Sequence, residues 1–165
     1  MRQDDKFITE FSRSQGNLPH WEDVGATYFV RCSLQRPATV DLTAPELGQI
    51  VVGALLFGDG QRYHLYDYTV MPDHVHAIIQ PIASGRSAER IRSVMYTLKH
   101  WTARKINSAL AREGSLWQEE SYDHIIRSRE DYEEKAQYIF WNPHKAGLID
   151  DPAKWPWWGR GSGCS

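Results

Sequence analysis

The sequence has few of the features that mark secreted, membrane or disulfide-stabilised proteins. It holds only two cysteines in 165 residues, Cys32 and Cys164, which is too few for a disulfide framework. No apolar run approaches the roughly 20 residues that a membrane-spanning helix needs. The first residues are acidic and polar, whereas a secretory signal would be basic and then apolar. We therefore expect a cytoplasmic protein that does not associate with membranes.

An overall excess of basic residues is also lacking. The formal net charge is -2, with 24% charged and 41% hydrophobic residues, which is close to the average for globular proteins. A negative net charge argues weakly against nucleic acid as a partner. The length suits one domain with a core of its own. We expect a single domain over residues 1–165, in which residues 148–165 form a C-terminal tail.

The charge is nevertheless unevenly distributed along the chain. Between Arg86 and Arg112 one acidic residue, Glu89, accompanies seven basic residues. This segment is where a phosphate backbone would find counter-charges. The alternative is that the basic residues form a solvated face of a helix. From this segment we select four candidate DNA contacts, namely Arg90, Arg92, Lys99 and Arg104.

Alternating strand-like and helix-like segments predict an α+β fold. Thr43 is the predicted N-cap of the first helix and Ser128 that of the last, which Pro143 and Gly147 are expected to end. The order is that of a ferredoxin-like antiparallel sheet with the helices packed on one face. We expect strands at residues 24–35, 63–70, 74–82 and 122–126, and helices at residues 44–57, 87–113 and 128–141.

Two histidines are predicted to share one face of a strand. His74 and His76 are two residues apart, so their side chains project to the same side with Cα atoms roughly 6–7 Å apart. Two imidazoles in this arrangement can bind one metal ion, although histidines on a strand can also face solvent or share hydrogen bonds. Asp73 could orient one of the rings, or serve only in the turn after Pro72.

A tyrosine and an asparagine are predicted to share one face of the last helix. Tyr138 and Asn142 are four residues apart, so their Cβ atoms lie about 5–6 Å apart. The asparagine oxygen can be a third metal ligand that leaves the ion accessible to a phosphate and to the tyrosine. Alternatively, Tyr138 is a core aromatic residue and Asn142 a helix cap. Tyr96 and His100 form a competing pair with the same spacing.

Five stretches of the chain, taken in order, resemble one known family. They lie between residues 24 and 158, and they read YTVMPDHVH at 68–76, LWQ at 116–118, YDHIIR at 122–127, YIFWNPHKAGL at 138–148 and WPWW at 155–158. They are similar to the single-tyrosine transposases of the His-hydrophobic-His (HUH) class, an IS200/IS605-like group. Within it they most resemble the repetitive-extragenic-palindrome (REP)-associated tyrosine transposases, or RAYTs.

The resemblance implies a role for four positions. His74 and His76 match the metal-binding pair, Tyr138 matches the nucleophile, and Asn142 stands where RAYTs have asparagine and related transposases have glutamine. It further implies the HUH endonuclease fold and an Mg²⁺ or Mn²⁺ cofactor. The implied activity is a transposase that nicks and joins single-stranded DNA at hairpins of palindromic repeats. It would act through a 5′-phosphotyrosine intermediate with a free 3′-hydroxyl.

The chemistry of the residues agrees with these roles. A phenol with a pKa of about 10 is a poor nucleophile at neutral pH, and a nearby cation would favour the phenolate. Lys145, His144 and His124 are close to the motifs in sequence and could contact phosphate or simply lie on the surface. Of these we select Lys145 as a further candidate DNA contact.

The C-terminal tryptophans Trp155, Trp157 and Trp158 allow two interpretations. Aromatic rings stack on unpaired bases with about 1–3 kcal/mol each, so these residues could bind DNA. The tail could instead fold back so that the rings complete the core or cover the active site.

Other functions remain open from the sequence alone. The protein could bind a DNA hairpin with weak or no catalysis, or it could be a ferredoxin-like RNA-binding module with aromatic residues exposed on its central strands. It could also be a zinc protein, although zinc usually has more nitrogen or sulfur ligands. We expect a monomer, with a dimer as the alternative.

Overall fold

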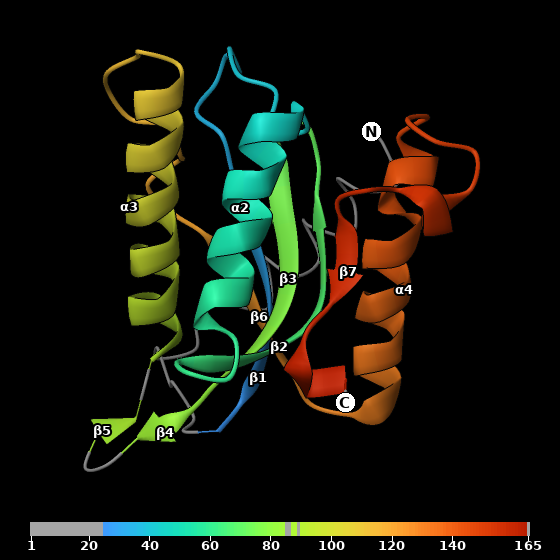
Figure 1. Cartoon of the computed structure of the whole chain (residues 1–165). Coiled ribbons are helices and arrows are strands. Elements are labelled where there is room, and N and C mark those ends of the chain that lie inside the picture. The colour runs from blue at the N-terminus through green and yellow to red at the C-terminus, as the bar shows by residue number, and fades with distance from the viewer. Residues whose placement is uncertain (1–24, 85–86, 89, 165) are drawn as a thin grey trace.

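The computed structural model describes residues 25–84, 87–88 and 90–164. Of the residues used above, Val24, Arg86 and Glu89 lie outside this range. Among the described residues, no helix is both long and apolar enough to cross a bilayer. The elements (Figure 1) are β1 (Thr27–Ser33), α2 (Pro45–Gly58), β2 (Tyr63–Val70), β3 (His74–Pro81), β4 (Ala83–Ser84), β5 (Ser87–Ala88), α3 (Ile91–Ala109), β6 (Tyr122–Ile126), α4 (Arg129–Lys145), β7 (Trp158–Arg160) and two short 3-10 helices, η1 (Pro152–Lys154) and η2 (Ser162–Cys164).

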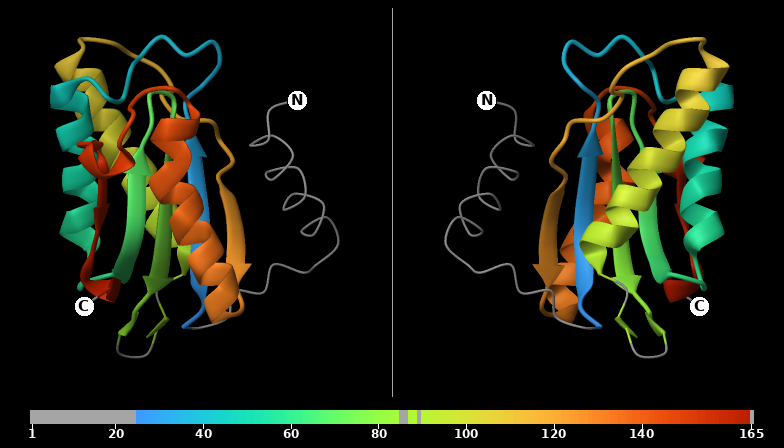
Figure 2. Two further views of the ribbon diagram at one scale, coloured as in Figure 1. Left: turned by 90° about the vertical axis from the view of Figure 1, so that its right-hand side faces the viewer. Right: turned by 90° about the vertical axis from the view of Figure 1, so that its left-hand side faces the viewer.

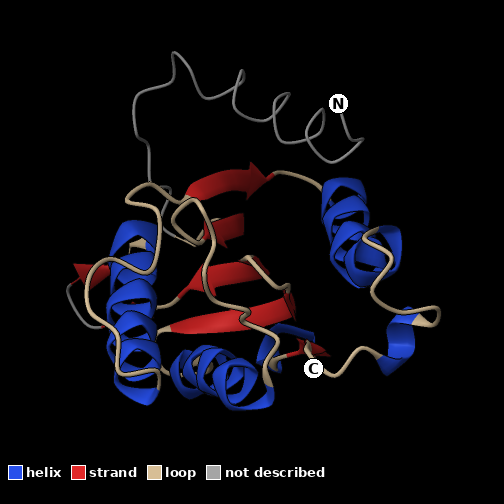
Figure 3. Ribbon diagram, turned by 90° about the horizontal axis from the view of Figure 1, so that it is seen from above, coloured by secondary structure: helices blue, strands red, loops and turns tan. Residues whose placement is uncertain are grey.

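Five strands form one antiparallel sheet in the order β6-β1-β3-β2-β7. The first four strands have the order expected of a ferredoxin-like fold, and the predicted α+β class is confirmed. The helices, however, do not all lie on one face. Helices α2 and α3 cover one face and α4 covers the other (Figures 2 and 3). The sheet requires this because its central strands are apolar on both sides.

Two separate cores follow from this arrangement. On β1, Tyr28 and Val30 belong to the core under α2 and α3, whereas Phe29 between them points to α4. On β3, Ile79 belongs to the core under α2 and α3, whereas Ile78 belongs to the core under α4. This alternation puts His74 and His76 on the face that α4 covers.

The first two helices begin at positions other than those predicted. Thr43 does not cap α2, because its N–H and its hydroxyl both donate to Asp41 Oδ1, at 2.9 and 2.6 Å, and Ala44 takes the N-cap position. Helix α3 begins at Ile91, since residues 87–88 pair with residues 83–84 in a small hairpin. It ends at Ala109, and Ala111 then adopts a left-handed conformation with φ of 49°.

Helix α4 begins as predicted but extends further. The Ser128 hydroxyl accepts a hydrogen bond from the Asp131 N–H at 3.0 Å. The helix continues through Pro143, which removes only the backbone bond that its missing N–H would have made. It ends where Gly147, with φ of 75°, donates to the His144 carbonyl and Leu148 donates to the Pro143 carbonyl. Asn142 therefore remains helical, one turn after the nucleophile candidate.

The predicted tail is part of the fold. Strand β7 pairs with the edge of β2, and the Trp155 indole N–H donates to the Val70 carbonyl at 3.1 Å. Trp157 packs over Gly48 on α2, where a Cβ would lie 2.6 Å from the indole ring. Trp158 meets Phe140 on α4 with ring centroids 5.0 Å apart. Of the two interpretations of these tryptophans, the structure supports completion of the core.

Candidate active site

Four predicted site residues meet between β3 and α4. The imidazole centroids of His74 and His76 are 4.8 Å apart, and the His76 ring lies 5.3 Å from the Tyr138 ring. Asn142 lies beside His74 and acts to raise the pKa of that histidine. The two-residue spacing on the strand and the four-residue spacing on the helix thus bring all four side chains to one site.

His74 is held from behind by a carboxylate. Its Nδ1 lies 2.7 Å from Asp73 Oδ1, and the other oxygen of Asp73 pairs with Arg36 at 2.9 Å. Asp73 also lies in the turn between β2 and β3, in which the Met71 N–H donates to the His74 carbonyl at 2.8 Å. Burial lowers the pKa of His74, and the bond to Asp73 opposes that shift. A neutral ring that donates from Nδ1 presents its Nε2 lone pair to the site.

His76 is fully buried with no such support. It is 0% exposed, and neither ring nitrogen has a well-formed hydrogen bond within the described structure. Its ring stacks on Phe29 with centroids 5.2 Å apart. Burial holds the pKa of His76 well below 6.5, with further lowering by His74 and Arg31 and an opposing effect of the Val30 backbone. The ring is therefore a neutral base with an available lone pair.

Asn142 adds a third available acceptor. It is 4% exposed, and its Oδ1 has no hydrogen-bond partner among the described residues. A buried acceptor left unpaired destabilises a protein by about 1–3 kcal/mol, so such groups usually have a function. Two imidazole nitrogens and one amide oxygen suit Mn²⁺ and would leave positions for water and phosphate. The donor set therefore fits the metal that the sequence predicts.

Two of the alternative functions are less compatible with this site. The described residues contain no cluster of three or more His, Cys, Asp or Glu side chains able to hold a metal, whereas structural zinc usually has four nitrogen or sulfur ligands. An RNA-binding module would expose aromatic residues on the central strands. Here α4 covers that surface of the sheet.

Tyr138 lies at the centre of the core under α4. It is 8% exposed, and its ring meets Phe29 edge-on with centroids 6.0 Å apart. Lys145 Nζ lies 6.0 Å from the centre of the Tyr138 ring, which makes Lys145 the predicted DNA contact that adjoins the site. The competing pair, Tyr96 and His100, stacks on α3 across the sheet from these residues.

The other predicted DNA contacts lie on α3 or, in the case of Arg90, at its N-cap, on the far face of the sheet. Arg90, Arg92 and Arg104 are exposed there. Lys99 has a different role, because its ammonium donates to the carbonyls of Gln118 and Glu119 at 2.7 and 2.8 Å. Its charge secures the 118–119 segment, so the sequence interpretation of Lys99 as a phosphate contact is the weakest of the four.

The nearby histidines that the sequence left open both have structural partners. His124 Nε2 lies 3.0 Å from Asp131 Oδ2, and Lys135, only 1% exposed, binds the other oxygen of Asp131 at 2.9 Å. Burial acts to raise the pKa of Asp131, but these partners lower it below its ordinary value. His144 Nδ1 lies 2.9 Å from the Asp150 carbonyl.

A buried polar cluster escaped the sequence interpretation. Asp67 on β2, 1% exposed, accepts a hydrogen bond from the Tyr132 hydroxyl of α4 and another from Arg160 Nε of β7 at 3.0 Å. The sequence interpretation also missed Arg31 of β1, which lies opposite His76 of β3 in the sheet register. The available signal was a charged residue in the middle of a strand otherwise rich in apolar side chains.

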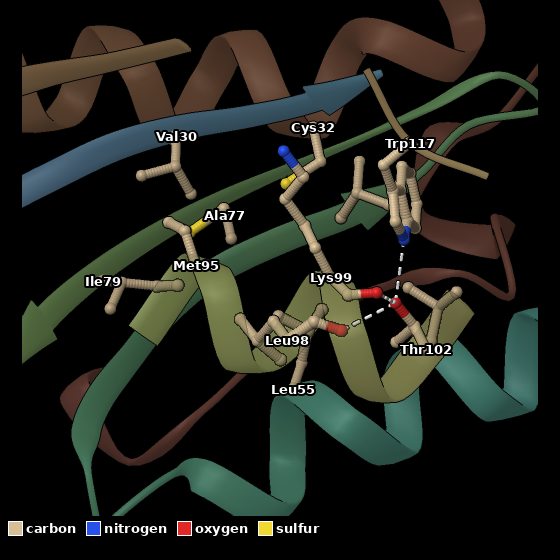
Figure 4. Close-up of a pocket in the computed structure, with 12 residues that line it drawn as sticks. Val30, Cys32, Leu55, Ala77, Ile79, Met95, Leu98, Lys99, Thr102 and Trp117 are labelled. Carbon is tan, nitrogen blue, oxygen red and sulfur yellow. Dashed lines mark hydrogen bonds between the residues drawn. The ribbon is translucent and has the colours of Figure 1, made fainter. Parts of the chain in front are cut away.

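A small apolar pocket among the described residues lies away from this chemistry. It has a volume of about 30 Å³ between the sheet and α3 (Figure 4). Trp117 closes it by donating to Thr102 Oγ1 at 2.9 Å, and burial raises the pKa of Cys32 in its wall to about 11. A cavity of this size has room for about one water molecule, and Cys32 is a protonated thiol. It is therefore a packing defect and no candidate for a nucleotide site.

Comparisons with known proteins identify the family to which the chain is similar. The family model described as "Transposase IS200 like" matches residues 56–141. A Haemophilus influenzae protein that carries the name REP-associated tyrosine transposase is 28% identical over 94 residues, which cover 53% of each chain. The REP-associated tyrosine transposase of Escherichia coli is 25% identical over 134 residues, which cover 80% of this chain and 74% of the relative. The chain thus spans about half the length of the first relative and about three quarters of the second.

A solved structure has the same fold. It is that of a REP-associated tyrosine transposase bound to a REP hairpin, with a TM-score of 0.70 and 22% sequence identity. The superposition covers 87% of this chain and 82% of the other. The predicted fold and the resemblance to RAYTs are confirmed.

Proposed function

Because this chain belongs to the family of IS200-like transposases, we propose that it is a metal-dependent endonuclease and strand-transferase. Its substrate would be single-stranded DNA beside hairpins of palindromic repeats. The observation that carries the proposal is the placement of Tyr138 against His76, at a site where His76 and Asn142 have unpaired acceptors. A relative of similar fold is bound to a REP hairpin, which supports the choice of substrate.

In the proposed reaction the Tyr138 oxygen attacks the phosphorus of one phosphodiester. The new bond joins Tyr138 to the 5′ side of the break, the bond from phosphorus to the 3′ oxygen breaks, and that oxygen leaves as a hydroxyl after gaining a proton. Tyr138 loses its own proton to solvent. A bound Mg²⁺ or Mn²⁺ would offset charge on the phosphoryl oxygens and favour the phenolate.

The protein's residues prepare this step. His74, His76 and Asn142 would hold the ion, and Asp73 fixes the ring of His74. Burial keeps both imidazoles neutral and able to bind. The reverse reaction, in which a 3′-hydroxyl attacks the phosphotyrosine, restores a phosphodiester without another energy source because the covalent intermediate conserves the bond energy.

Replacing Tyr138 by phenylalanine tests the proposal. The substrate is a fluorescent hairpin oligonucleotide with a single-stranded flank, taken from the DNA beside the gene and incubated with Mn²⁺ or Mg²⁺. We expect wild-type protein to give a covalent adduct on a denaturing gel and Tyr138→Phe to give none. Hairpin affinity should stay within about twofold, because phenylalanine keeps the packing against Phe29 and His76. Tyr96→Phe, on the exposed face of α3, is the matched control and should form the adduct normally.

The burial of Tyr138 favours one alternative, a hairpin-binding protein with weak or no catalysis. The hydroxyl must reach a phosphate, although the residue as a whole is only 8% exposed. In that case wild-type protein would bind the hairpin and yield no adduct with either metal. Undiminished adduct in Tyr138→Phe would instead show that another residue is the nucleophile.

A further inference from the structure

A row of five side chains crosses the whole sheet beneath α4. In register, Tyr122 of β6 pairs with Arg31 of β1, Arg31 with His76 of β3, His76 with Thr69 of β2, and Thr69 with Trp158 of β7. Cross-strand partners project to the same face of a sheet. Every member of the row carries a polar group, and the row passes through the proposed metal site.

Arg31 is the cationic member of this row. It is half-buried, and its Nε donates to Ser33 Oγ at 3.0 Å, which fixes the direction of the side chain. In the described part of the chain, the remaining guanidinium donors have no hydrogen-bond or ion-pair partner. Asp73, an acid close enough to feel its charge, is already bound by His74 and Arg36. Arg31 therefore has donors available on the active-site face.

Arg31 lies beside the proposed metal ligands. It is the in-register partner of His76, and His74 is two residues away on the same strand. A cation beside a metal site opposes binding of the metal unless an anion joins them, because like charges a few ångströms apart repel strongly in a poorly solvated site. The position of Arg31 becomes favourable once a phosphate lies between its guanidinium and the metal ion.

Two neighbours of Arg31 in the sheet also contact the nucleophile candidate, Tyr138. Phe29, two residues earlier on the same face of β1, contacts the Tyr138 ring, and so does His76, the cross-strand partner of Arg31. The guanidinium is planar and binds two oxygens of one phosphate at once. Its position and geometry suit the group that Tyr138 attacks.

We propose that Arg31 donates hydrogen bonds to the non-bridging oxygens of the scissile phosphate. The inference rests on the proposed function, in which that phosphate gains negative charge as the Tyr138 oxygen approaches. Arg31 stabilises this charge, while the bonds that form and break remain those between phosphorus, Tyr138 and the 3′ oxygen. It is a catalytic contact in addition to the four residues that the sequence predicts.

Single-turnover cleavage of the hairpin substrate tests the catalytic part. Arg31→Ala should slow cleavage about 100-fold or more, as loss of one donor to a developing oxyanion does in other enzymes, and Arg31→Lys should be intermediate. The melting temperature should change little for Arg31→Lys, which keeps the charge, whereas hairpin affinity should fall by no more than the lost bidentate contact accounts for, about fivefold. The matched control is Arg129→Ala, an exposed arginine at the start of α4, which should cleave at the wild-type rate. Wild-type cleavage by both Arg31 variants would overturn the proposal.

A binding experiment locates the contact without requiring cleavage. In the Tyr138→Phe background, a neutral methylphosphonate replaces the scissile phosphate or, in separate oligonucleotides, a neighbouring one. We expect the scissile replacement to weaken binding about fivefold or more with Arg31 present, less in Arg31→Lys, which keeps the charge but loses the bidentate contact, and not at all in Arg31→Ala. An equal loss in both backgrounds, or coupling to a different phosphate, contradicts the proposal. If wild-type protein forms no adduct, the proposed function fails, whereas this coupling still decides whether Arg31 binds that phosphate.

Discussion

At the residue scale, the two histidines of the site are supported differently. His74 is oriented by Asp73 and Arg36 whether or not a metal is bound. His76 instead depends on stacking with Phe29, and its nitrogens are unpaired. The Oδ1 of Asn142 is likewise unpaired among the described residues. A bound ion would supply the missing partner for both, so metal binding should also stabilise the folded protein.

The first prediction concerns the ion. Mn²⁺ should raise the melting temperature of the wild type, because a ligand at 100 times its Kd adds about 2.7 kcal/mol to the free energy of unfolding. His76→Ala should abolish both this increase and cleavage, and excess EDTA should stop cleavage by the wild type. Calorimetric titration and thermal melts measure the two effects. His100→Ala, on the far face, is the control. Full activity of the wild type in EDTA would exclude a metal mechanism.

A second prediction concerns pH in the metal-free protein. Burial lowers the pKa of His74 and His76 below 6.5, so below pH 6.5 the unfolded chain takes up protons that the folded chain does not. Stability is thus fully present above pH 6.5 and declines on acidification, by up to about 1.4 kcal/mol per pH unit for each ring. Urea unfolding between pH 7.5 and 5 should show this, with a shallower slope for His76→Phe. Equal slopes would contradict the assignment to His76.

At the element scale, α4 is the component that assembles the site. It carries Tyr138 and Asn142, and its first half is fixed to β2 and β7 through Asp67, which binds both Tyr132 and Arg160. A second attachment joins Asp131 of α4 to His124 of β6, and the buried Lys135, one turn later on α4, binds the other oxygen of Asp131. The distance between the nucleophile and the histidines therefore depends on groups outside the site.

The third prediction tests this attachment. Asp67→Asn keeps the size of the side chain but removes the charge that pairs with Arg160, so urea unfolding should show a loss of about 1–3 kcal/mol. Cleavage should fall while hairpin binding remains, because α4 loses its position relative to β3. Glu133→Gln, which breaks an exposed pair with Arg129, should change stability by less than about 0.5 kcal/mol. Equal effects of the two changes would refute the role given to Asp67.

Local spacing explains how much could be predicted from the sequence. The strand period places His74 beside His76, and the helix period places Tyr138 above Asn142, so each pair is fixed by its own segment. The resemblance to RAYTs then indicated that the two pairs belong to one site. Periodicity does not say which face of a sheet a helix covers, so α4 was placed on the wrong side. Arg31 and Asp67 were missed because their partners come from distant strands.

At the scale of the whole molecule, the proposed catalytic and basic surfaces lie on opposite faces of the sheet. Tyr138 belongs to α4, whereas Arg92 and Arg104 belong to α3 and Arg90 is its N-cap. The two helices lie on opposite faces of the sheet (Figure 2). A hairpin bound along α3 would have to send its single-stranded flank around an edge of the sheet to reach Tyr138. The two surfaces would then contribute to different steps, affinity and cleavage.

The fourth prediction separates these steps by salt dependence. If α3 binds the backbone of the hairpin, each of Arg90→Ala, Arg92→Ala and Arg104→Ala should flatten the plot of log affinity against log salt by about 0.7–0.9. Cleavage at saturating DNA should stay unchanged. Lys99→Ala should destabilise the protein instead, since Lys99 holds two backbone carbonyls. Binding insensitive to salt, or a preference for fully paired duplex, would leave the basic residues as a solvated face.

Trp157 and Trp158 are neighbours in the chain, yet they contact different cores. The first packs with the residues under α2 and α3, and the second with those under α4. Displacing β7 would therefore expose both cores at once. The two layers cannot open independently at this edge of the sheet, which makes the unfolding of α2 cooperative with that of α4. Any movement of α4 that exposes Tyr138 to DNA must accordingly be small enough to keep Trp158 in place, or it will loosen the opposite layer as well.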